Sequence, residues 1–412
     1  MNGENKVKEK DMPVHDWYRF VLSFPPHLVQ EYIEKFSISQ NDVVLDPFCG
    51  TGTTNVECKK HGIASIGIEA SPITYFASST KCKWKNADMQ MYKDAVLVAN
   101  QARATIETSK EFRHLTTEQE KLILKNSISE DPLNQVLILR DTIYSVHSDY
   151  EDYFLLALAK HIVYSYSNLK FGPEVGISRK KVYSVDVVDI WLDQVRTIQN
   201  DLDRYRGLSN TYSQIINGDS RTINPSNISK KVNFVITSPP YPNEKDYSRT
   251  TRLESVLLGY INTKEDLRSI KKHFIRSNTK NVYKDDDDFR FIEDIGSISS
   301  LSKTIEDKRI ELNKTSGFEK LYSKVVRLYF GGMARHLINL KPILADGARL
   351  AYVVGDQASY FNIPIRTAEL LAEVAEHAGY RVENIDHFRK RYATATDTWL
   401  NEDVLILKYM GG

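Results

Sequence analysis

Hydrophobic residues recur with two different periods along the chain. Residues 41–72 begin with the apolar run "VVLD", pass through a Gly-rich turn and a short helical stretch, and end in the second apolar run "ASIGIE". Two buried strands joined by a helix form a βαβ unit, which implies a parallel sheet. From residue 85 the period becomes helical, which predicts helices near 88–110, 117–128, 133–146 and 150–168.

Strand-like alternation returns after a helix predicted over 187–206. Two runs, "YSQIINGD" (212–219) and "NFVITSPP" (233–240), each end in polar or turn residues and indicate further strands of the same sheet. The last part predicts a helix at 318–341, a strand at 349–356, a helix at 364–378, and the strand pair "YRVENIDHF" and "EDVLILKY". We therefore expect an α/β fold with a Rossmann-like sheet that includes one antiparallel strand.

Two stretches interrupt this α/β order and are predicted insertions. The first, 85–181, is helical, and the second, 261–324, is polar, mixed in charge and contains the acidic run Asp285 to Asp288. The sheet domain is then built from three segments, 1–84, 182–260 and 325–412.

Composition narrows the class of protein. A hydrophobic content of 41% is ample for a core, and a net charge of +1 means that any polyanion would be bound by local clusters. Three cysteines without CxxC spacing indicate reduced thiols in a cytoplasmic protein, so we expect no disulfide framework and no metal site. The N-terminus has no signal-peptide core, and the longest apolar stretch (153–164) is too short to cross a membrane and predicts a buried helix.

The Gly-rich turn is the first candidate binding site. Gly50 and Gly52 stand where a strand gives way to a helix, so a ligand can approach bare backbone there. The turn lacks the third glycine of a dinucleotide-binding motif and the lysine of a P-loop. Glu69 ends the next strand, where a carboxylate can accept both hydroxyls of a ribose, and Asp219 ends the third, near the edge of an adenine. These residues predict a pocket for an adenosine without phosphates; a tight turn with two capping carboxylates is the alternative.

Three motifs resemble a known enzyme family. "DPFCGTGTT", the strand-end acid in "GIEASP" and the later "TSPPY" look like those of class I S-adenosylmethionine-dependent methyltransferases that act on exocyclic amino groups of DNA bases, the N4-cytosine and N6-adenine type. The resemblance covers the α/β portions and neither insertion, and it implies S-adenosylmethionine as the cofactor. Carried over to this chain, its cofactor-binding residues are Asp46, Pro47, Phe48, Gly50, Gly52, Thr53, Glu69 on the ribose side and Asp219 on the adenine side.

An N-terminal segment extends the resemblance. "HDWYRFVLSFPPHLVQEYI" (15–33) is similar to the segment that closes over the methionine end of the cofactor in this family. His15 and the run from Phe24 through Pro25 to Pro26 would carry that role. An ordinary amphipathic helix with a Pro-Pro entrance is the alternative.

The motif "TSPPY" carries the predicted chemistry. An exocyclic amine on an aromatic ring is a poor nucleophile because its lone pair is delocalised into the ring. Ser238 Oγ and the Pro239 carbonyl can each accept an N–H hydrogen bond from the amine and so localise that pair as it attacks the methyl group. Pro239 and Pro240 fix backbone φ angles, and Tyr241 offers a face on which an extruded base can stack. The alternative is that Ser-Pro-Pro only opens a loop.

Candidate DNA contacts follow the catalytic motif. Two arginines in "DYSRTTRLE" (246–254) are placed to reach phosphates beside the extruded base, or else to pair with acids on their own helix. The stretch 264–284 is strongly basic, which favours the second insertion as the target-recognition segment. "FRKRY" (388–392) lines the DNA face or forms a solvated hairpin. The predicted phosphate contacts are Arg249, Arg252, Lys271, Lys272 and Arg276.

These features together predict a DNA methyltransferase acting on the N4 amine of cytosine in a specific double-stranded site, by base flipping. The choice of cytosine rests on Ser238, because the resemblance associates Ser-Pro-Pro-Tyr mainly with cytosine and Asp-Pro-Pro-Tyr mainly with adenine. N6-adenine methylation, tRNA guanine-N2 methylation and a non-catalytic DNA-binding role are the alternatives. The expected partners are double-stranded DNA and a cognate restriction endonuclease or defence-system proteins, with no membrane.

Overall fold

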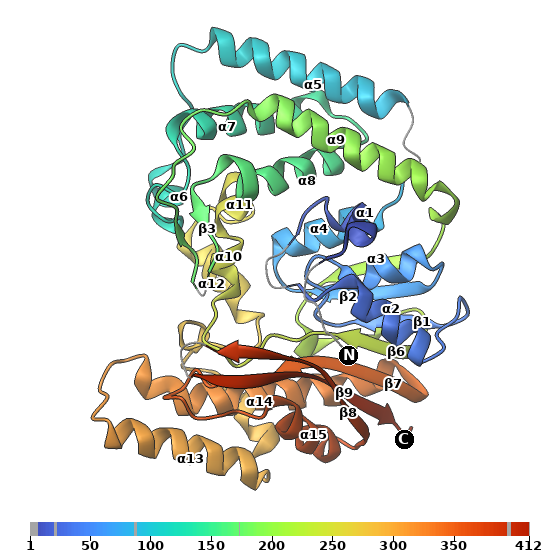
Figure 1. Cartoon of the computed structure of the whole chain (residues 1–412), viewed down its shortest axis with the longest axis vertical. Coiled ribbons are helices and arrows are strands. Elements are labelled where there is room, and N and C mark those ends of the chain that lie inside the picture. The colour runs from blue at the N-terminus through green and yellow to red at the C-terminus, as the bar shows by residue number, and fades with distance from the viewer. Residues whose placement is uncertain (1–6, 20–22, 86–88, 173, 394–396, 412) are drawn as a thin grey trace.

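A seven-stranded sheet forms the centre of the computed structural model, which describes residues 7–19, 23–85, 89–172, 174–393 and 397–411 (Figure 1). The strand order is β5-β2-β1-β6-β7-β9-β8, and the described pairs are parallel except those that β9 makes with β7 and β8. The strands are β1 (Val43–Asp46), β2 (Ala64–Glu69), β5 (Ser213–Asn217), β6 (Val232–Thr237), β7 (Leu344–Gly355), β8 (Tyr380–Ala393) and β9 (Thr398–Tyr409). The predicted Rossmann-like sheet with one antiparallel strand is confirmed.

Alternate residues of the central strands face two different layers of helices. In β1, Val43 and Leu45 pack in a cluster with α14 and α15, whereas Val44 between them packs with α2 and α3. Helices on both faces bury every residue of β1, which is why this strand is a continuous apolar run in the sequence. The helices around the sheet are α1 (Met12–His15), α2 (Pro26–Lys35), α3 (Thr53–Lys60), α4 (Pro72–Cys82), α14 (Tyr322–Leu340) and α15 (Thr367–His377).

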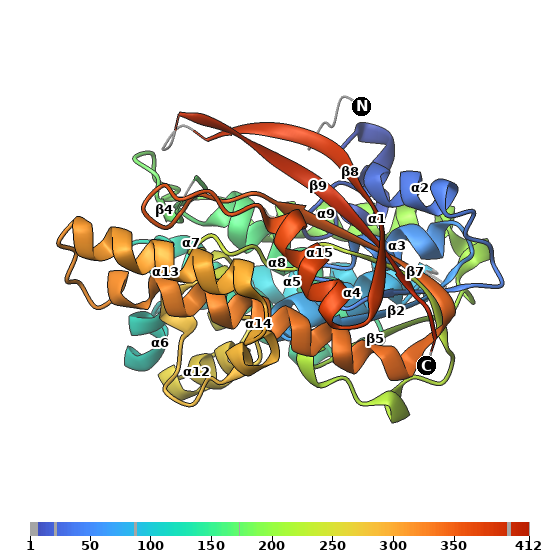
Figure 2. The same cartoon turned by 90° about the horizontal axis from the view of Figure 1, so that it is seen from below.

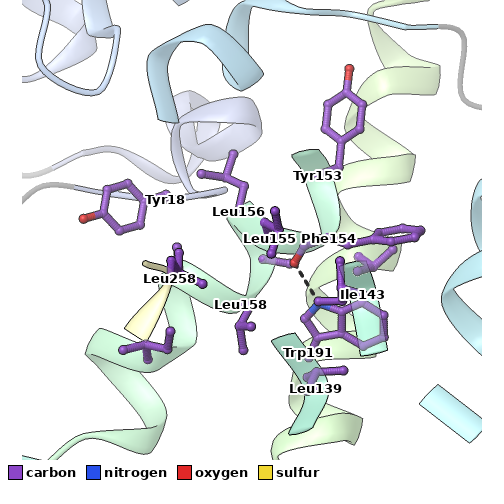
Figure 3. Close-up of a cluster of buried hydrophobic side chains, with 14 of the residues drawn as sticks. Tyr18, Leu139, Ile143, Tyr153, Phe154, Leu155, Leu156, Leu158, Trp191 and Leu258 are labelled. Carbon is purple, nitrogen blue, oxygen red and sulfur yellow. Dashed lines mark hydrogen bonds between the residues drawn. The ribbon is translucent and has the colours of Figure 1, made fainter. Parts of the chain in front are cut away.

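A helical layer lies above the sheet in Figure 1. Its helices are α5 (Met89–Thr108), α6 (Thr117–Leu122), α7 (Glu130–Val146), α8 (Glu151–His161) and α9 (Val187–Arg204), followed or linked by a π-helix (Ile162–Tyr166) and the two-residue strands β3 (Leu169–Lys170) and β4 (Gly176–Ile177). The four helices predicted between residues 88 and 168 are confirmed. The Trp191 indole of α9 donates to the Phe154 carbonyl of α8 at 2.9 Å, inside an apolar cluster (Figure 3). Helix α9 thus packs with this layer, although the sequence boundary at 182 assigned it to the sheet domain.

The second insertion packs along α14. Its main helices are α12 (Lys264–Lys272) and α13 (Gly296–Glu311), preceded by α10 (Tyr247–Thr250) and α11 (Arg252–Leu257) after the catalytic motif. Gly331 of α14 lies so close to the insertion that a Cβ there would stand 2.1 Å from the Asp288 carbonyl oxygen. The insertion is therefore docked by close backbone contact and does not project freely. None of the helices in the described residues is long and apolar enough to cross a membrane.

Candidate active site

A cavity of about 740 Å³ opens at the carboxyl ends of the parallel strands. Open α/β sheets bind ligands at this edge, where loops from successive strands converge. It brings together ten of the fifteen cofactor-binding and catalytic residues predicted from the sequence: Phe24, Pro47, Phe48, Gly50, Thr53, Glu69, Ser238, Pro239, Pro240 and Tyr241. Cofactor-side and catalytic-side residues thus share one cavity.

The Gly-rich turn exposes backbone to this cavity at one glycine. Gly50 has φ +52°, and a Cβ added there would meet no atom within 4 Å. Gly52, with φ +82°, instead packs on α4, because a Cβ there would lie 3.1 Å from Ser78 Cβ. Both backbone conformations favour glycine, but only Gly50 leaves open space for a ligand.

Glu69 ends β2 and lines the cavity. Its Oε2 accepts from the Gly50 backbone N–H at 2.9 Å and its Oε1 from the Ser71 backbone N–H at 2.8 Å. Burial raises the pKa of this carboxyl. Each carboxylate oxygen keeps a second lone pair, so the side chain can still accept hydroxyl hydrogen bonds. Together with the apolar walls of Phe48 and Ile68, this polar edge fits a nucleoside.

Asp46 does not reach the cavity, which corrects its predicted cofactor contact. The side chain is fully buried, and its Oδ1 accepts from Thr237 Oγ1 at 2.6 Å and from the Phe48 backbone N–H at 3.1 Å. Burial raises the pKa of the carboxyl to about 6. Asp46 thus ties the Gly-rich turn to the residue just before Ser238, and its role is to position both.

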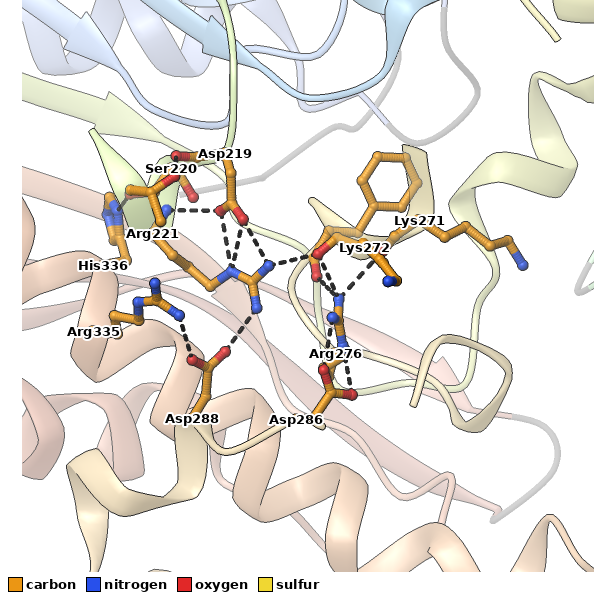
Figure 4. A network of polar contacts seen from close by, with 12 residues as sticks. Asp219, Ser220, Arg221, Lys271, Lys272, Arg276, Asp286, Asp288, Arg335 and His336 are labelled. Carbon is orange, nitrogen blue, oxygen red and sulfur yellow. Dashed lines mark hydrogen bonds and ion pairs between the residues drawn. The ribbon is translucent and has the colours of Figure 1, made fainter. Parts of the chain in front are cut away.

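Asp219 is likewise placed differently from the prediction. Its carboxylate accepts from Arg221 Nε at 3.0 Å and Nη2 at 2.7 Å, and it is buried in an ion-pair network that reaches Asp288 (Figure 4). The neighbours Gly218 and Ser220 line the cavity, but Asp219 does not. The expected contact between this carboxylate and an adenine edge therefore has no support in the geometry.

Ser238 belongs to a chain of polar groups that the sequence did not reveal. Its Oγ lies 3.3 Å from the Tyr241 hydroxyl, which donates to Glu402 Oε1 at 3.0 Å. Glu402, whose side chain is buried, is ion-paired with Arg389, its cross-strand neighbour in the β8–β9 hairpin. A tyrosine hydroxyl has one hydrogen, and here it is donated to Glu402. Ser238 must then donate to Tyr241, which leaves the lone pairs of Ser238 Oγ as acceptors.

Tyr241 is held between this hydrogen bond and the sheet. A Cβ at Gly355 would stand 3.1 Å from the Tyr241 ring, so the ring packs closely against glycine at the end of β7 and a larger residue there would push it aside. The Tyr241 backbone N–H donates a further hydrogen bond to the Tyr247 hydroxyl oxygen at 3.2 Å. The orientation of Tyr241 is therefore fixed from three sides.

The N-terminal residues lie around a second cavity of about 380 Å³, which shares Ser23, Phe24 and Thr53 with the first. His15 lines it and contacts Glu57 with Nε2 to Oε1 at 2.6 Å, and burial lowers the pKa of His15 to about 4. Pro25 is buried just before α2 and lines neither cavity. Residues 20–22 of the predicted cofactor-closing segment lie outside the described residues.

Lys81 is a second residue that the sequence did not single out. It is 1% exposed, lines the smaller cavity and donates to the Thr51 carbonyl of the Gly-rich turn at 3.2 Å. Burial lowers the pKa of its ammonium to about 7. A lysine in the last turn of a predicted helix gives no sequence signal for such burial.

The predicted phosphate contacts are mostly engaged inside the protein, and this corrects the expectation for them. Lys271 pairs with Asp246 at 2.7 Å. Arg276 pairs with Asp286 through two hydrogen bonds (Figure 4), and both cations are buried. Arg252 donates to backbone carbonyls and Ser248, and Arg249 pairs with Glu174 at 3.3 Å. Only Lys272 of the three predicted lysine and arginine contacts in the insertion is exposed.

This sheet topology, with a Gly-rich turn after β1, an acid at the end of β2 and a Ser-Pro-Pro-Tyr turn after β6, is the arrangement expected for the Rossmann-like sheet of class I methyltransferases. The cofactor of this class is S-adenosylmethionine, and the open backbone at Gly50 beside Glu69 fits its nucleoside part.

Comparisons with known proteins agree. A family model described as DNA methylase, of the N6/N4 type, matches residues 1–78. Type II methyltransferase M.BsoBI from Geobacillus stearothermophilus is 24% identical over 93% of this chain and 81% of its own length. Type II methyltransferase M.AvaI from Nostoc sp. is 23% identical over 91% of this chain and 81% of its own length. Type II methyltransferase M.MjaII from Methanocaldococcus jannaschii is 23% identical over 75% of this chain and 78% of its own length. The resemblance to DNA amino-methyltransferases is thus confirmed, without a distinction between N4-cytosine and N6-adenine.

Among solved structures, TrmN from Thermus thermophilus matches with a TM-score of 0.30 and 10% identity, over 93% of this chain and 48% of that one. A likeness of this size supports no statement about substrate.

Proposed function

We propose that the protein transfers the methyl group of S-adenosylmethionine to the exocyclic N4 amine of cytosine in a specific double-stranded DNA site. The observation that carries the proposal is the acceptor state of Ser238 Oγ, in the same cavity as Gly50 and Glu69. The similarity to proteins named type II methyltransferases supports DNA as the substrate.

In this proposal the cofactor supplies an electrophilic methyl group, and the protein's own residues prepare the amine. Ser238 Oγ and the Pro239 carbonyl accept the two N–H hydrogen bonds, which draws the nitrogen lone pair out of conjugation. Acceptors fixed before the reaction stabilise the transition state more than the ground state, because the amine becomes a better donor as positive charge develops on it.

The methylated amine carries an excess proton, which can be transferred away through Ser238 and Tyr241. Ser238 Oγ can take the proton as its own hydrogen passes to Tyr241, whose hydrogen passes in turn to the Glu402 carboxylate. No charged base has to touch the target amine. Glu402, held by Arg389, is the terminal acceptor of this chain.

The target base has to leave the DNA double helix to reach the cavity. A base inside a duplex cannot present its amine to a cavity at the edge of a sheet, so flipping is required, at a cost of a few kcal/mol. Tyr241, Pro240 and Leu400 line the part of the cavity next to Ser238 and would cover an extruded base. A pyrimidine needs less of this space than a purine, but the cavity does not by its volume exclude adenine.

The deciding experiment is nucleoside mass spectrometry of DNA and tRNA from cells that express the protein, with Ser238→Ala as control. N4-methylcytosine in DNA that disappears in Ser238→Ala is the expected result. N6-methyladenine alone would replace the cytosine assignment by the adenine one. Methylation confined to tRNA would overturn the DNA assignment.

A further inference from the structure

Two cations from different elements line the main cavity, and neither has an acidic hydrogen-bond or ion-pair partner among the described residues. Arg391 of β8 donates there to two uncharged acceptors, the Asp356 carbonyl at 2.7 Å and the Gln357 side chain at 2.9 Å. Lys245, in the loop after the catalytic turn, also lines the cavity, and its ammonium has no hydrogen-bond or ion-pair partner in the described part of the chain.

The two charges are close enough to repel one another. Burial and then the positive charge of Arg391 lower the pKa of the Lys245 ammonium. The negative charge of Glu174 raises the pKa of the Lys245 ammonium and so acts against Arg391, but Glu174 is already paired with Arg249. A pair of like charges held together in this way favours an anion between them.

An exposed aromatic pair follows Arg391 in the β8–β9 hairpin. Tyr392 and Trp399 are opposite each other in the β8–β9 hairpin, with ring centroids 5.3 Å apart and an interplanar angle of 63°. They are 48% and 62% exposed, and Tyr392 also borders the cavity. Figure 2 shows this hairpin extending beyond the rest of the sheet. Large aromatic side chains left in solvent at the rim of a cavity indicate a binding surface.

We propose that this rim, formed by Lys245, Arg391, Tyr392 and Trp399, is the surface on which duplex DNA docks. Lys245 and Arg391 hold a backbone phosphate next to the extruded nucleotide. Trp399 and Tyr392 stack against the bases that flank the gap left in the duplex by the extruded base. This inference rests on the proposed function, and it moves the DNA surface from the second insertion, where Lys271 and Arg276 are buried, to the hairpin.

Charge and position favour duplex DNA over other partners. The phosphate of a nucleotide whose base enters the cavity must lie at the rim, where these two cations are. Aromatic faces bind any base, so stacking needs no particular sequence and suits a role in opening the duplex. A protein partner would not require unpaired cations next to the catalytic cavity.

The first test is the salt dependence of binding to a fluorescent mixed-sequence DNA duplex. Lys245→Gln and Arg391→Gln should each reduce the slope of log affinity against log salt by about 0.9, as expected for one lost phosphate contact. Lys303→Gln removes the same charge from α13, away from the cavity, and should leave the slope unchanged. Equal slopes in all three variants and the wild type would overturn the phosphate site. A reduced slope with duplex RNA but not with DNA would overturn the choice of partner.

The second test separates opening of the duplex from the chemistry. With the modified position mapped, Trp399→Ala should lower kcat/KM on paired DNA about tenfold or more, since one lost base stack is worth on the order of 1–3 kcal/mol. A mismatch opposite the target base should restore most of the loss, because the base is then easier to extrude. Tyr183→Ala, at a residue 73% exposed and outside the cavity lining, is the control.

The outcomes distinguish this inference from the proposed function. If Trp399→Ala methylates paired DNA as fast as the wild type, or if the mismatch rescues nothing, the aromatic pair has no role in opening the duplex, although the methyltransferase assignment stands. If the wild type methylates no DNA, the proposed function itself fails.

Discussion

Ser238 is an acceptor because of residues near the other end of the chain. Its hydroxyl hydrogen points to Tyr241, since the Tyr241 hydrogen is donated to Glu402. The motif that contains Ser238 and Tyr241 can be predicted from the sequence, as can the turn that it forms after a buried strand. Glu402 and Arg389 could not be predicted, because their approach depends on the register of the β8–β9 hairpin, in which they are opposite each other. Register is a property of the folded sheet, and a shift by one residue would send both side chains to the other face.

Glu402→Gln tests this chain of hydrogen bonds. The amide keeps an acceptor but loses its negative charge, so kcat should fall about tenfold or more, consistent with a hydrogen bond to a charged group worth on the order of 1.5–3 kcal/mol. Affinity for S-adenosylmethionine should not change, because Glu402 lies on the catalytic side of the cavity. Single-turnover kinetics and calorimetry measure the two quantities separately.

Tyr241→Phe supplies the matched control for Glu402. If Glu402 acts only through the Tyr241 hydroxyl, the double variant should be no slower than Tyr241→Phe alone. Additive losses would mean that Glu402 acts on the substrate by another route, and the assigned hydrogen-bond direction would be wrong.

His15 links the N-terminal segment to α3 through Glu57, which also accepts from Gln30 and Lys60. Burial lowers the pKa of His15 to about 4, so the folded state favours the neutral ring. The contribution of neutral His15 to the stability of the folded protein is fully present above pH 6.5, the ordinary pKa of histidine. It is lost as the pH falls toward 4. Burial would raise the pKa of Glu57, but its hydrogen bonds and neighbouring positive charges lower it to about 2. The contribution of the Glu57 carboxylate to stability is therefore lost only below pH 4.5.

For the contact between His15 and Glu57, we predict that the wild type and His15→Gln differ in how their free energy of unfolding changes with pH. Between pH 6.5 and pH 4.5 the wild type should lose more free energy of unfolding than His15→Gln, which can still donate to Glu57 but cannot take up a proton. Urea unfolding at the two pH values measures this. Parallel losses in both proteins would show that His15 does not titrate in the folded state as described.

The second insertion shows where reading of elements from sequence stops. Its polar composition and its acidic run are visible in the sequence, yet its helices and the partners of that run are not. Asp286 pairs with Arg276 of the insertion, and Asp288 pairs with Arg221 and Arg335 outside it. A cluster of basic residues therefore looked like a DNA surface, because nothing in a linear sequence shows that Lys271 and Arg276 each meet an acid when the segment folds onto α14. The helices and strands of the sheet domain were predictable because burial on both faces imposes a pattern on the sequence.

Close packing of this insertion on α14 makes two adjacent glycines unequal. Gly331→Ala would place a Cβ 2.1 Å from the Asp288 carbonyl oxygen, so the backbone must move, and we expect a loss of about 1–3 kcal/mol or more in the free energy of unfolding. At Gly332 the nearest atom is Ile275 Cδ1 at 3.3 Å, the end of a flexible side chain. Gly332→Ala should be neutral or stabilising, since alanine is favoured over glycine in a helix by about 1 kcal/mol. Urea unfolding of both variants checks this, and equal effects would contradict the described docking.

Across the whole molecule, charges of both signs nearly cancel, with a net charge of +1, so the location of unpaired cations decides where a polyanion binds. Arg276 carries one of the charges that the sequence assigned to DNA, but its side chain is 4% exposed and forms two hydrogen bonds with Asp286. Removing one partner of a buried ion pair leaves the other charge without compensation, at a cost of about 3–5 kcal/mol.

Arg276→Gln should therefore destabilise the protein without changing the salt dependence of DNA binding by the molecules that remain folded. Arg290→Gln is the matched control, because Arg290 lies in the same insertion, is 57% exposed and pairs with Asp287, so its loss should cost at most about 1 kcal/mol. Urea unfolding gives the stabilities, and binding to a mixed-sequence duplex at several salt concentrations gives the slopes. If Arg276→Gln is as stable as the wild type but has a reduced salt slope, its guanidinium contacts phosphate and the insertion is a DNA surface after all. If only stability falls, the charge that appeared in the sequence as a DNA contact is one that holds the insertion in place.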